Sequence, residues 1–127
     1  MVPELKCQGG GKIINVSSVA GVGSFPNSAP YCASKGGLNM LTKSLCLELA
    51  RFGINDNTLS PGNIMMPMNE DLRTGGEWCE RVRYRTPTVE DFLPAVDMAG
   101  TAVLLASDDA RSVHGANIMV DAGWAAR

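Results

Sequence analysis

Short stretches with the residues of buried strands recur along the chain, and each of them is followed by residues that favour turns. The first and third are rich in β-branched and other apolar side chains, whereas the second, INDNTLS, also contains polar residues. Glycine, proline, serine or aspartate comes directly after each stretch and indicates where a strand would end. We therefore predict three strands, at residues 12–17, 54–60 and 117–120.

The segments between the predicted strands have the spacing of helices. In the first of them, leucines recur at intervals of three and four residues, which places them on one helix face. These are Leu38, Leu41, Leu45 and Leu49. The helix is predicted to begin near Tyr31 and to end at Gly53. Gly36 and Gly37 lower its helix propensity and therefore indicate close backbone packing against another element.

A further helix is predicted at residues 95–107, so the order of elements is strand, helix, strand, helix, strand. That alternation is typical of α/β proteins, in which helical crossovers join parallel strands. In such sheets ligands bind at the carboxyl ends of the strands, where Ser17-Ser18 and Pro61-Gly62 fall. Residues 65–94 are predicted to form a looser connection, which is interpreted as a substrate loop or lid, with a merely flexible excursion as the alternative.

The composition is that of one globular domain, with 45% hydrophobic and 19% charged residues in 127. The formal net charge of −2 and the lack of a basic run argue against nucleic acid or an anionic membrane as a partner. No apolar stretch approaches the ~18 residues of a membrane-spanning helix, and no secretory signal is visible at the N-terminus. We therefore expect a cytoplasmic protein.

Histidine and cysteine are too sparse for the commonest metal and triad sites. His114 is the only histidine, which leaves no spare residue for a Ser/His/Asp triad or a histidine-rich metal site. The cysteines are irregularly spaced without a CxxC pair, so reduced thiols are expected rather than zinc ligands or disulfides. They are Cys7, Cys32, Cys46 and Cys79.

Some charged residues stand at unexpected places. Asp56 lies inside the second predicted strand, where both faces are expected to be buried and an unpaired carboxylate would be costly. Arg81, Arg83 and Arg85 alternate within the long connection and could serve an acidic substrate. Because alternating arginines are more often a solvated face, we favour that interpretation.

The segment YCASK, residues 31–35, places a phenol and an ammonium four residues apart at the predicted start of the long helix. Positions i and i+4 share a helix face, with Cβ atoms roughly 5–6 Å apart. Tyr31 and Lys35 could therefore act on one bound molecule. The same spacing occurs by chance on many surface helices, so the pair alone predicts no activity.

Four motifs occur in order and together resemble the C-terminal half of a short-chain dehydrogenase/reductase. They are GKIINVSS, Tyr31-x-x-x-Lys35 thirteen residues after Ser18, LSPGNI and GANIMVDAG. The match covers residues 11–123, and glucose-dehydrogenase-like and 3-oxoacyl-reductase-like members are the most similar. The resemblance implies a Rossmann-like parallel sheet with helices on its faces, NAD or NADP as cofactor, and a small-molecule alcohol or carbonyl substrate. It also implies a homo-oligomer, a dimer or tetramer, in the complete protein.

The resemblance assigns a role to each matching residue. Tyr31 would act as general acid/base on the substrate oxygen, and Lys35 would stabilise its phenolate and bind the nicotinamide ribose. Ser18 would hydrogen-bond the same oxygen without acting as a nucleophile, because no base is visible to activate it. The remaining implied cofactor contacts are the backbone groups at Pro61, Gly62 and Ile64.

The chain also departs from the family pattern. Its three glycines at residues 9–11 precede a predicted strand, whereas the dinucleotide fingerprint follows a strand and opens a helix. The resemblance therefore implies that residues 1–127 are the C-terminal part of a single domain whose N-terminal dinucleotide-binding half is missing. Met66 stands where the family usually has a threonine that bonds the nicotinamide carboxamide.

Two functions remain open on the sequence. The chain is expected to derive from an NAD(P)-dependent oxidoreductase that acts by hydride transfer and is inactive as this fragment. The alternative is a catalytically silent remnant, or an oligomerisation or interaction module, of the same fold.

Overall fold

A parallel three-stranded sheet forms the centre of the molecule in the computed structural model, which describes residues 1–126. The strands lie in the order β1 (Gly11–Val16), β2 (Ile54–Pro61) and β3 (Asn117–Val120). β2 is the middle strand, and both of its neighbours run parallel to it. The predicted parallel sheet is confirmed, and no strand end differs by more than one residue from its predicted position.

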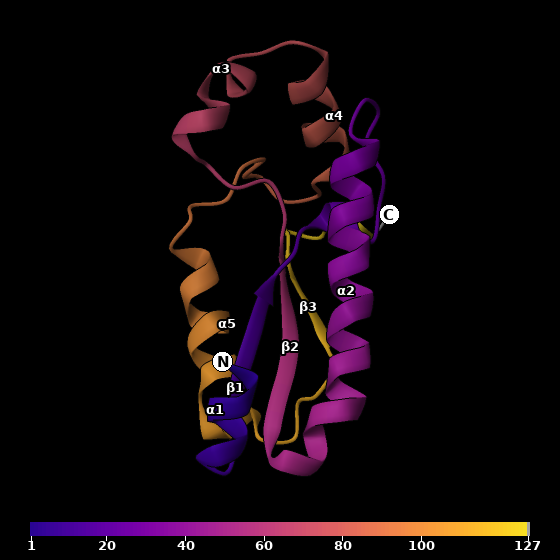
Figure 1. Cartoon of the computed structure of the whole chain (residues 1–127). Helices are drawn as coiled ribbons and strands as arrows, with labels where there is room; N and C mark the ends of the chain where they lie inside the picture. Colours follow the sequence, from indigo (N-terminus) through magenta and orange to yellow (C-terminus); the bar gives the residue numbers. More distant parts are fainter. Residues whose placement is uncertain (127) are drawn as a thin grey trace.

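Helices cover both faces of the sheet, as Figure 1 shows. α2 (Ala29–Leu49) lies on one face and α5 (Asp97–Ala106) on the other, close to their predicted positions. A short 3-10 turn follows α2, and Gly53 then adopts the left-handed conformation, φ 70°, that often ends a helix. α1 (Val2–Cys7) precedes the first strand. Within residues 1–126, no helix has the length and apolar character needed to cross a bilayer.

Each face of the sheet has its own apolar core. Ile13, Leu49 and Ile54 meet between the sheet and α2. Leu59 packs against Leu105 of α5 on the opposite face. Successive side chains of a strand point to opposite faces, so β2 contributes to both cores in turn.

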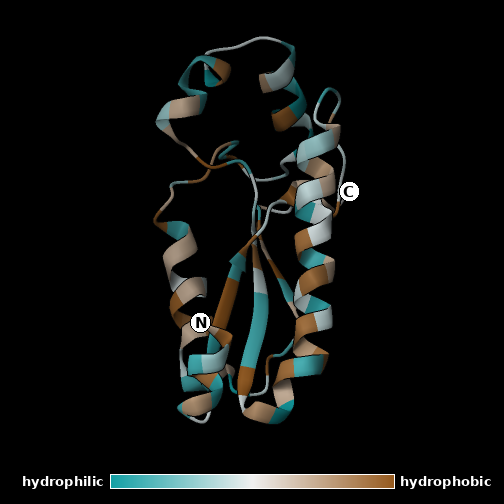
Figure 2. Ribbon diagram, viewed as in Figure 1, coloured by the Kyte–Doolittle hydropathy of each residue, from teal (hydrophilic) through white to brown (hydrophobic). Residues whose placement is uncertain are grey.

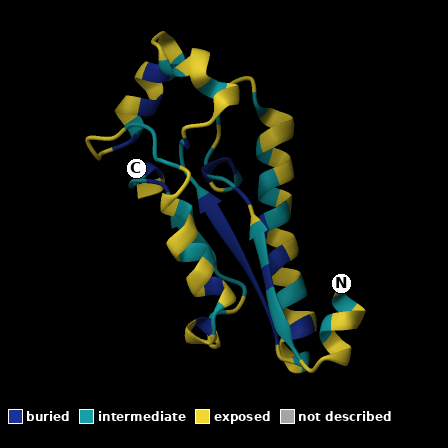
Figure 3. Ribbon diagram, turned by 90° about the vertical axis from the view of Figure 1, so that its left-hand side faces the viewer, coloured by how far each residue is buried: buried dark blue, intermediate teal, exposed yellow. Residues whose placement is uncertain are grey.

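The middle strand is polar although it is buried. Figure 2 shows the centre of β2 as hydrophilic, and Figure 3 shows the same strand as buried. The side-chain amides of Asn55 and Asn57 donate to the carbonyl of Val113 over 3.0 and 2.7 Å, which holds the loop before β3 against the sheet. On the face of α2, Asp56 Oδ1 accepts a hydrogen bond of 2.8 Å from Asn15, which also donates to Thr42 of α2.

The long connection between β2 and α5 is more ordered than the sequence indicated. It contains α3 (Glu70–Arg73) and α4 (Glu77–Arg85), which lie beyond the carboxyl ends of the strands (Figure 1). A β-bridge between Ile64 and Leu93 joins the two ends of this excursion. The prediction of a loose connection was therefore wrong over these helices.

The close approach predicted at two glycines of α2 was also wrong. A Cβ atom added to Gly37 would meet nothing within 4 Å, and one added to Gly36 would meet only the carbonyl oxygen of Gly21, at 3.7 Å. The tight contact involves Gly21 itself, where a Cβ would lie 2.5 Å from Asn39 Nδ2. The loop after β1 therefore supplies the small residue, and α2 supplies the larger side chain.

Candidate active site

A cavity of about 1250 Å³ opens at the carboxyl edge of the sheet. Because β1 and β2 are parallel, the residues that follow them reach this edge side by side. The first turns of α2, the helix α4 and Trp124 form other parts of the wall. The cavity is lined by all six predicted site residues, which are Ser18, Tyr31, Lys35, Pro61, Gly62 and Ile64.

Tyr31 and Lys35 lie together on the first turns of α2. The ammonium of Lys35 is 5.7 Å from the centre of the Tyr31 ring and donates a 2.9 Å hydrogen bond to the carbonyl of Val16. That bond ties the side chain to the end of β1 and holds its charge beside the phenol. Tyr31 is 50% exposed and faces the cavity, so its hydroxyl can be reached by a bound molecule.

Ser18 caps a local turn and also lines the cavity. Its Oγ accepts a 3.1 Å hydrogen bond from the backbone of Ala20, in the 3-10 turn Val19–Gly21. A hydroxyl that accepts one bond can still donate its proton to another partner. The neighbouring Ser17 donates to the carbonyl of Lys35 over 3.2 Å, which connects the strand end to α2.

The segment after β2 passes unusually close to the segment after β3. A Cβ atom on Gly62 would lie 2.7 Å from the Cα atom of Asp121, so no larger residue fits there without a backbone shift. Asn63 follows, and its side-chain nitrogen is buried without a hydrogen-bond partner among the described residues. A buried donor of this kind usually has a partner, which makes Asn63 a candidate ligand-binding residue that the sequence analysis missed.

Two aromatic side chains and a cation form another part of the cavity wall. Trp124 is buried and stacks on Phe25, with ring centres 5.0 Å apart. The guanidinium of Arg85 lies 4.7 Å from the Trp124 ring. All three residues line the cavity. They come from distant parts of the sequence, and no local pattern connects them.

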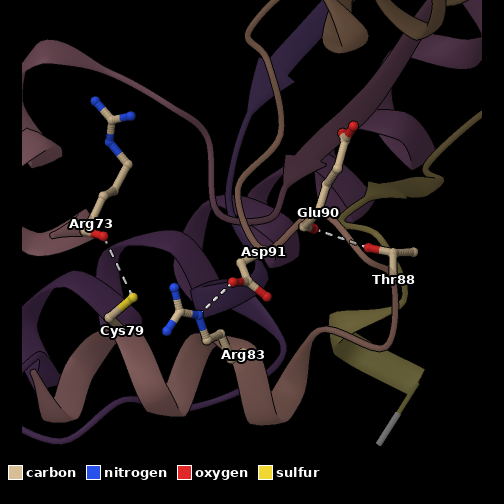
Figure 4. Close-up of polar contacts among 6 residues, drawn as sticks. All are labelled: Arg73, Cys79, Arg83, Thr88, Glu90 and Asp91. Carbon is tan, nitrogen blue, oxygen red and sulfur yellow. Dashed lines mark hydrogen bonds and ion pairs between the residues drawn. The ribbon is translucent and has the colours of Figure 1, made fainter. Parts of the chain in front are cut away.

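α4 is attached to its surroundings by a few polar contacts, which Figure 4 shows. Arg83 donates from Nε to Asp91 over 2.7 Å, and the bonded carboxylate raises the pKa of Arg83. The thiol of Cys79 lies 3.7 Å from the carbonyl of Arg73 at the end of α3. Arg81 pairs with Glu77 one turn earlier on the same helix.

The predicted solvated face of arginines is therefore only partly right. Arg81 and Arg83 are exposed, and each pairs with a carboxylate at the surface. Arg85 is only half-exposed, because its side chain covers the face of Trp124. Among residues 1–126, no group of three or more histidine, cysteine, aspartate or glutamate side chains could hold a metal ion.

The sequence matches a known family model over residues 1–125, and the description of that model is enoyl-(acyl carrier protein) reductase. The chain is 32% identical to a D-beta-hydroxybutyrate dehydrogenase of Rhizobium meliloti, with 99% of the chain and 52% of the relative covered. It is 40% identical to a 3-oxoacyl-(acyl-carrier-protein) reductase of Rickettsia conorii, with 89% of the chain and 46% of the relative covered.

Solved structures show the same fold. A gluconate 5-dehydrogenase from Burkholderia cenocepacia, in complex with NADP and tartrate, superposes with a TM-score of 0.92 at 34% identity. A structure described as that of a 2-deoxy-D-gluconate 3-dehydrogenase from Agrobacterium tumefaciens, with bound NADP, superposes with a TM-score of 0.92 at 37% identity. The superpositions cover 98% of this chain but only 49% and 51% of those proteins. The chain thus spans about half the length of the proteins that it matches.

Proposed function

Because this chain belongs to the short-chain dehydrogenase/reductase family, we propose that it carries the catalytic part of an NAD(P)-dependent oxidoreductase acting on a small alcohol or carbonyl compound. The observation that carries the proposal is the arrangement at the carboxyl edge of the sheet. Ser18, Tyr31 and Lys35 line one cavity there, together with the segment at residues 61–64. We further propose that residues 1–127 are the C-terminal part of a single domain.

The residues present fit the nicotinamide end of such a cofactor. The unpartnered nitrogen of Asn63 can donate to a carboxamide oxygen, and the tight turn at Gly62 leaves the backbone of Ile64 at the cavity wall. Lys35 supplies a positive charge and further donors for a ribose hydroxyl. Met66, also at the wall, offers only a thioether, a weak acceptor that cannot replace a hydroxyl donor. When bound, the nicotinamide supplies or accepts the hydride at the reacting carbon.

The chain's own side chains handle the proton at the reacting oxygen. Tyr31 donates its phenolic proton to that oxygen in reduction and takes it back in oxidation. An unperturbed phenol has a pKa near ~10, so work at neutral pH requires that the phenolate be stabilised. The ammonium of Lys35, held beside the ring by Val16, provides that stabilisation. Ser18 donates its hydroxyl proton to the same oxygen and fixes its position.

A second candidate function is association through α2 without catalysis. Large apolar side chains of this helix are exposed, among them Met40 at 63%, Leu41 at 50% and Leu47 at 85%. Exposed apolar side chains that share a helix usually mark an interaction surface. A dimer or tetramer formed through this face is compatible with either function. The second candidate is favoured only if the catalytic variant described next has no effect.

The test is carbonyl-dependent oxidation of NADH and NADPH by the complete protein that contains this chain. Tyr31→Phe keeps the ring and removes the proton donor, so turnover should fall at least ~100-fold, as is typical when a general acid is lost. Tyr84, the only other tyrosine, also lines the cavity, from α4, where it is 78% exposed. Tyr84→Phe removes the same hydroxyl group at a position without the neighbouring Lys35 and is the matched comparison. Near-normal turnover of Tyr31→Phe in a chemistry-limited assay would overturn the proposed mechanism.

A further inference from the structure

We propose that Arg85 binds a carboxylate on the substrate, so that the enzyme acts on hydroxy or oxo acids rather than on neutral alcohols and ketones. This inference rests on the proposed function and adds the class of substrate to it. It starts from a difference among the three arginines of α4. Arg81 pairs with Glu77 and Arg83 pairs with Asp91. Arg85 has no ion pair among the described residues, although it lies on the cavity wall.

The position of Arg85 prepares it to bind an anion. Its guanidinium lies against the indole of Trp124, which is itself fixed by stacking on Phe25. A guanidinium stacked on a ring uses its face for that contact and keeps its N–H donors at the edge. These donors match the two oxygens of a carboxylate in a bidentate bond. Because the side chain is already half-buried and held in place, binding an anion costs less side-chain entropy.

The charge around the cavity favours an anion with a single charge. The wall is lined by three cations, which are Lys35, Arg81 and Arg85, and by two carboxylates, which are those of Glu77 and Glu80. One positive charge is left over, which a carboxylate neutralises. A phosphate ester carries nearly two negative charges at neutral pH and would leave an unbalanced negative charge in the cavity. The wall therefore suits a carboxylate better than a phosphate.

The cavity also has room for an acid next to a cofactor. Its volume of about 1250 Å³ exceeds the range of roughly 300–1,000 Å³ that is usual for one small ligand. The lining includes residues 61–64 and Lys35, which we assign to the nicotinamide, and also Phe25, Arg85 and Trp124, which are left for a substrate. The apolar faces of Phe25 and Trp124 suit the carbon chain of an acid whose charged end is held by Arg85.

The inference is tested by binding without cofactor, on the complete protein that contains this chain. The probes are 4-oxopentanoate, its neutral amide 4-oxopentanamide, and dihydroxyacetone phosphate, followed by NMR of the tryptophan indole N–H groups. The acid should bind at least about tenfold more tightly than the amide, as expected for a hydrogen bond to a charged group. Equal binding of acid and amide would overturn the inference, and tighter binding of the phosphate ester would overturn the choice of carboxylate.

Variants assign the preference to one side chain. Arg85→Gln should abolish the preference for the acid and leave the affinity for the amide unchanged, which also shows that the cavity is intact. Arg85→Lys keeps the charge but loses the planar guanidinium, so this variant should retain only part of the preference for the acid. Arg83→Gln removes a charge of the same sign from the same helix and should keep the preference, because Arg83 is paired with Asp91 and does not line the cavity. A preference that survives in Arg85→Gln, or one that is lost in Arg83→Gln, would overturn the inference.

The result is separable from the proposed function. Acid binding that depends on Arg85, without any cofactor oxidation by the complete protein, would reject the oxidoreductase and keep the anion site. Efficient reduction of neutral ketones without a preference for acids would reject the anion site and keep the oxidoreductase.

Discussion

Asp56 is the residue whose environment is least favourable to its charge. It is fully buried in the middle strand, and one carboxylate oxygen accepts a bond from Asn15 while the other has no partner among residues 1–126. Among those residues, no cation forms an ion pair with it. Burial raises the pKa of Asp56 from 3.8 to about 6, because a charged group loses more hydration than a neutral one. The polar strand therefore carries a cost at neutral pH.

The cost has a defined dependence on pH. Since the pKa of Asp56 is higher in the folded state, the folded form holds its proton more tightly than the unfolded form does. This contribution to stability is complete below pH 3.8 and is lost as the pH rises through about 6. A shift from 3.8 to about 6 corresponds to roughly 3 kcal/mol. Above the pKa of Asp56 in the folded protein, the lost stability no longer changes with pH.

We predict that Asp56→Val raises the free energy of unfolding at pH 7 by roughly 1–3 kcal/mol, because it removes a desolvated carboxylate and adds apolar burial. The gain should shrink toward pH 4, where the carboxyl group of the folded protein is protonated. Asn15 keeps its bond to Thr42 in the variant. Denaturant melts of both proteins between pH 4 and pH 8 measure the difference, and Asp56→Asn serves as the polar isostere. A pH-independent difference would contradict the buried carboxylate.

At the scale of elements, the two outer helices and the strands β1 and β3 could be predicted because each has a local pattern, and β2 followed from the turn residues that bound it. Leu49 anchors one core, at a position that the leucine spacing indicates, and Leu105 of the other helix anchors the second. α4 could not be predicted in the same way. Only Cys79 and Val82 of this helix are buried, and two positions do not make a periodic apolar face. Its place is set by contacts with distant residues, such as Trp78 with Phe92 at 5.6 Å.

The open surface at Gly37 leads to a prediction for α2. Gly37→Ala should raise the stability of the chain by roughly 0.5–1 kcal/mol, because alanine restricts the unfolded chain and favours the helix. Nothing within 4 Å would meet the added methyl group. Thermal and denaturant melts measure the change. Gly62→Ala is the contrasting variant, since its methyl group would meet Asp121 at 2.7 Å and should destabilise the fold. A lower stability of Gly37→Ala would mean that another surface packs at this position.

At the scale of the whole molecule, half of the candidate site follows from topology. Parallel strands end at one edge, so Ser18 and Gly62 had to lie near each other, and a helix that begins at the same edge brings Tyr31 with it. The part of the wall formed by Arg85 and Trp124 could not be foreseen, because these residues meet only through the path of the long connection. Nothing in the spacing of three alternating arginines shows which of them lies against an indole.

The same architecture limits how the isolated chain can hold a dinucleotide. The residues that we propose for the nicotinamide end, Lys35, Asn63 and Ile64, line the cavity. A pyrophosphate is usually held by a glycine-rich turn that follows a strand and opens a helix. The glycines at residues 9–11 instead form the turn from α1 into β1, with φ of 86° at Gly9 and 145° at Gly10. The described chain therefore presents no such cradle for the phosphates.

We predict that residues 1–127 bind NADH and NADPH far more weakly than the low-micromolar range. Because the contacts are confined to the nicotinamide end, reduced nicotinamide mononucleotide should bind about as well as either dinucleotide. Lys35→Ala should weaken all three, whereas Lys12→Ala, on the far part of β1, should weaken none. Calorimetric titration of the unchanged chain and of both variants with each of the three ligands measures these differences directly. A low-micromolar dissociation constant for either dinucleotide, or a clear advantage of the dinucleotides over the mononucleotide, would show that this chain holds the pyrophosphate through residues other than a glycine-rich turn.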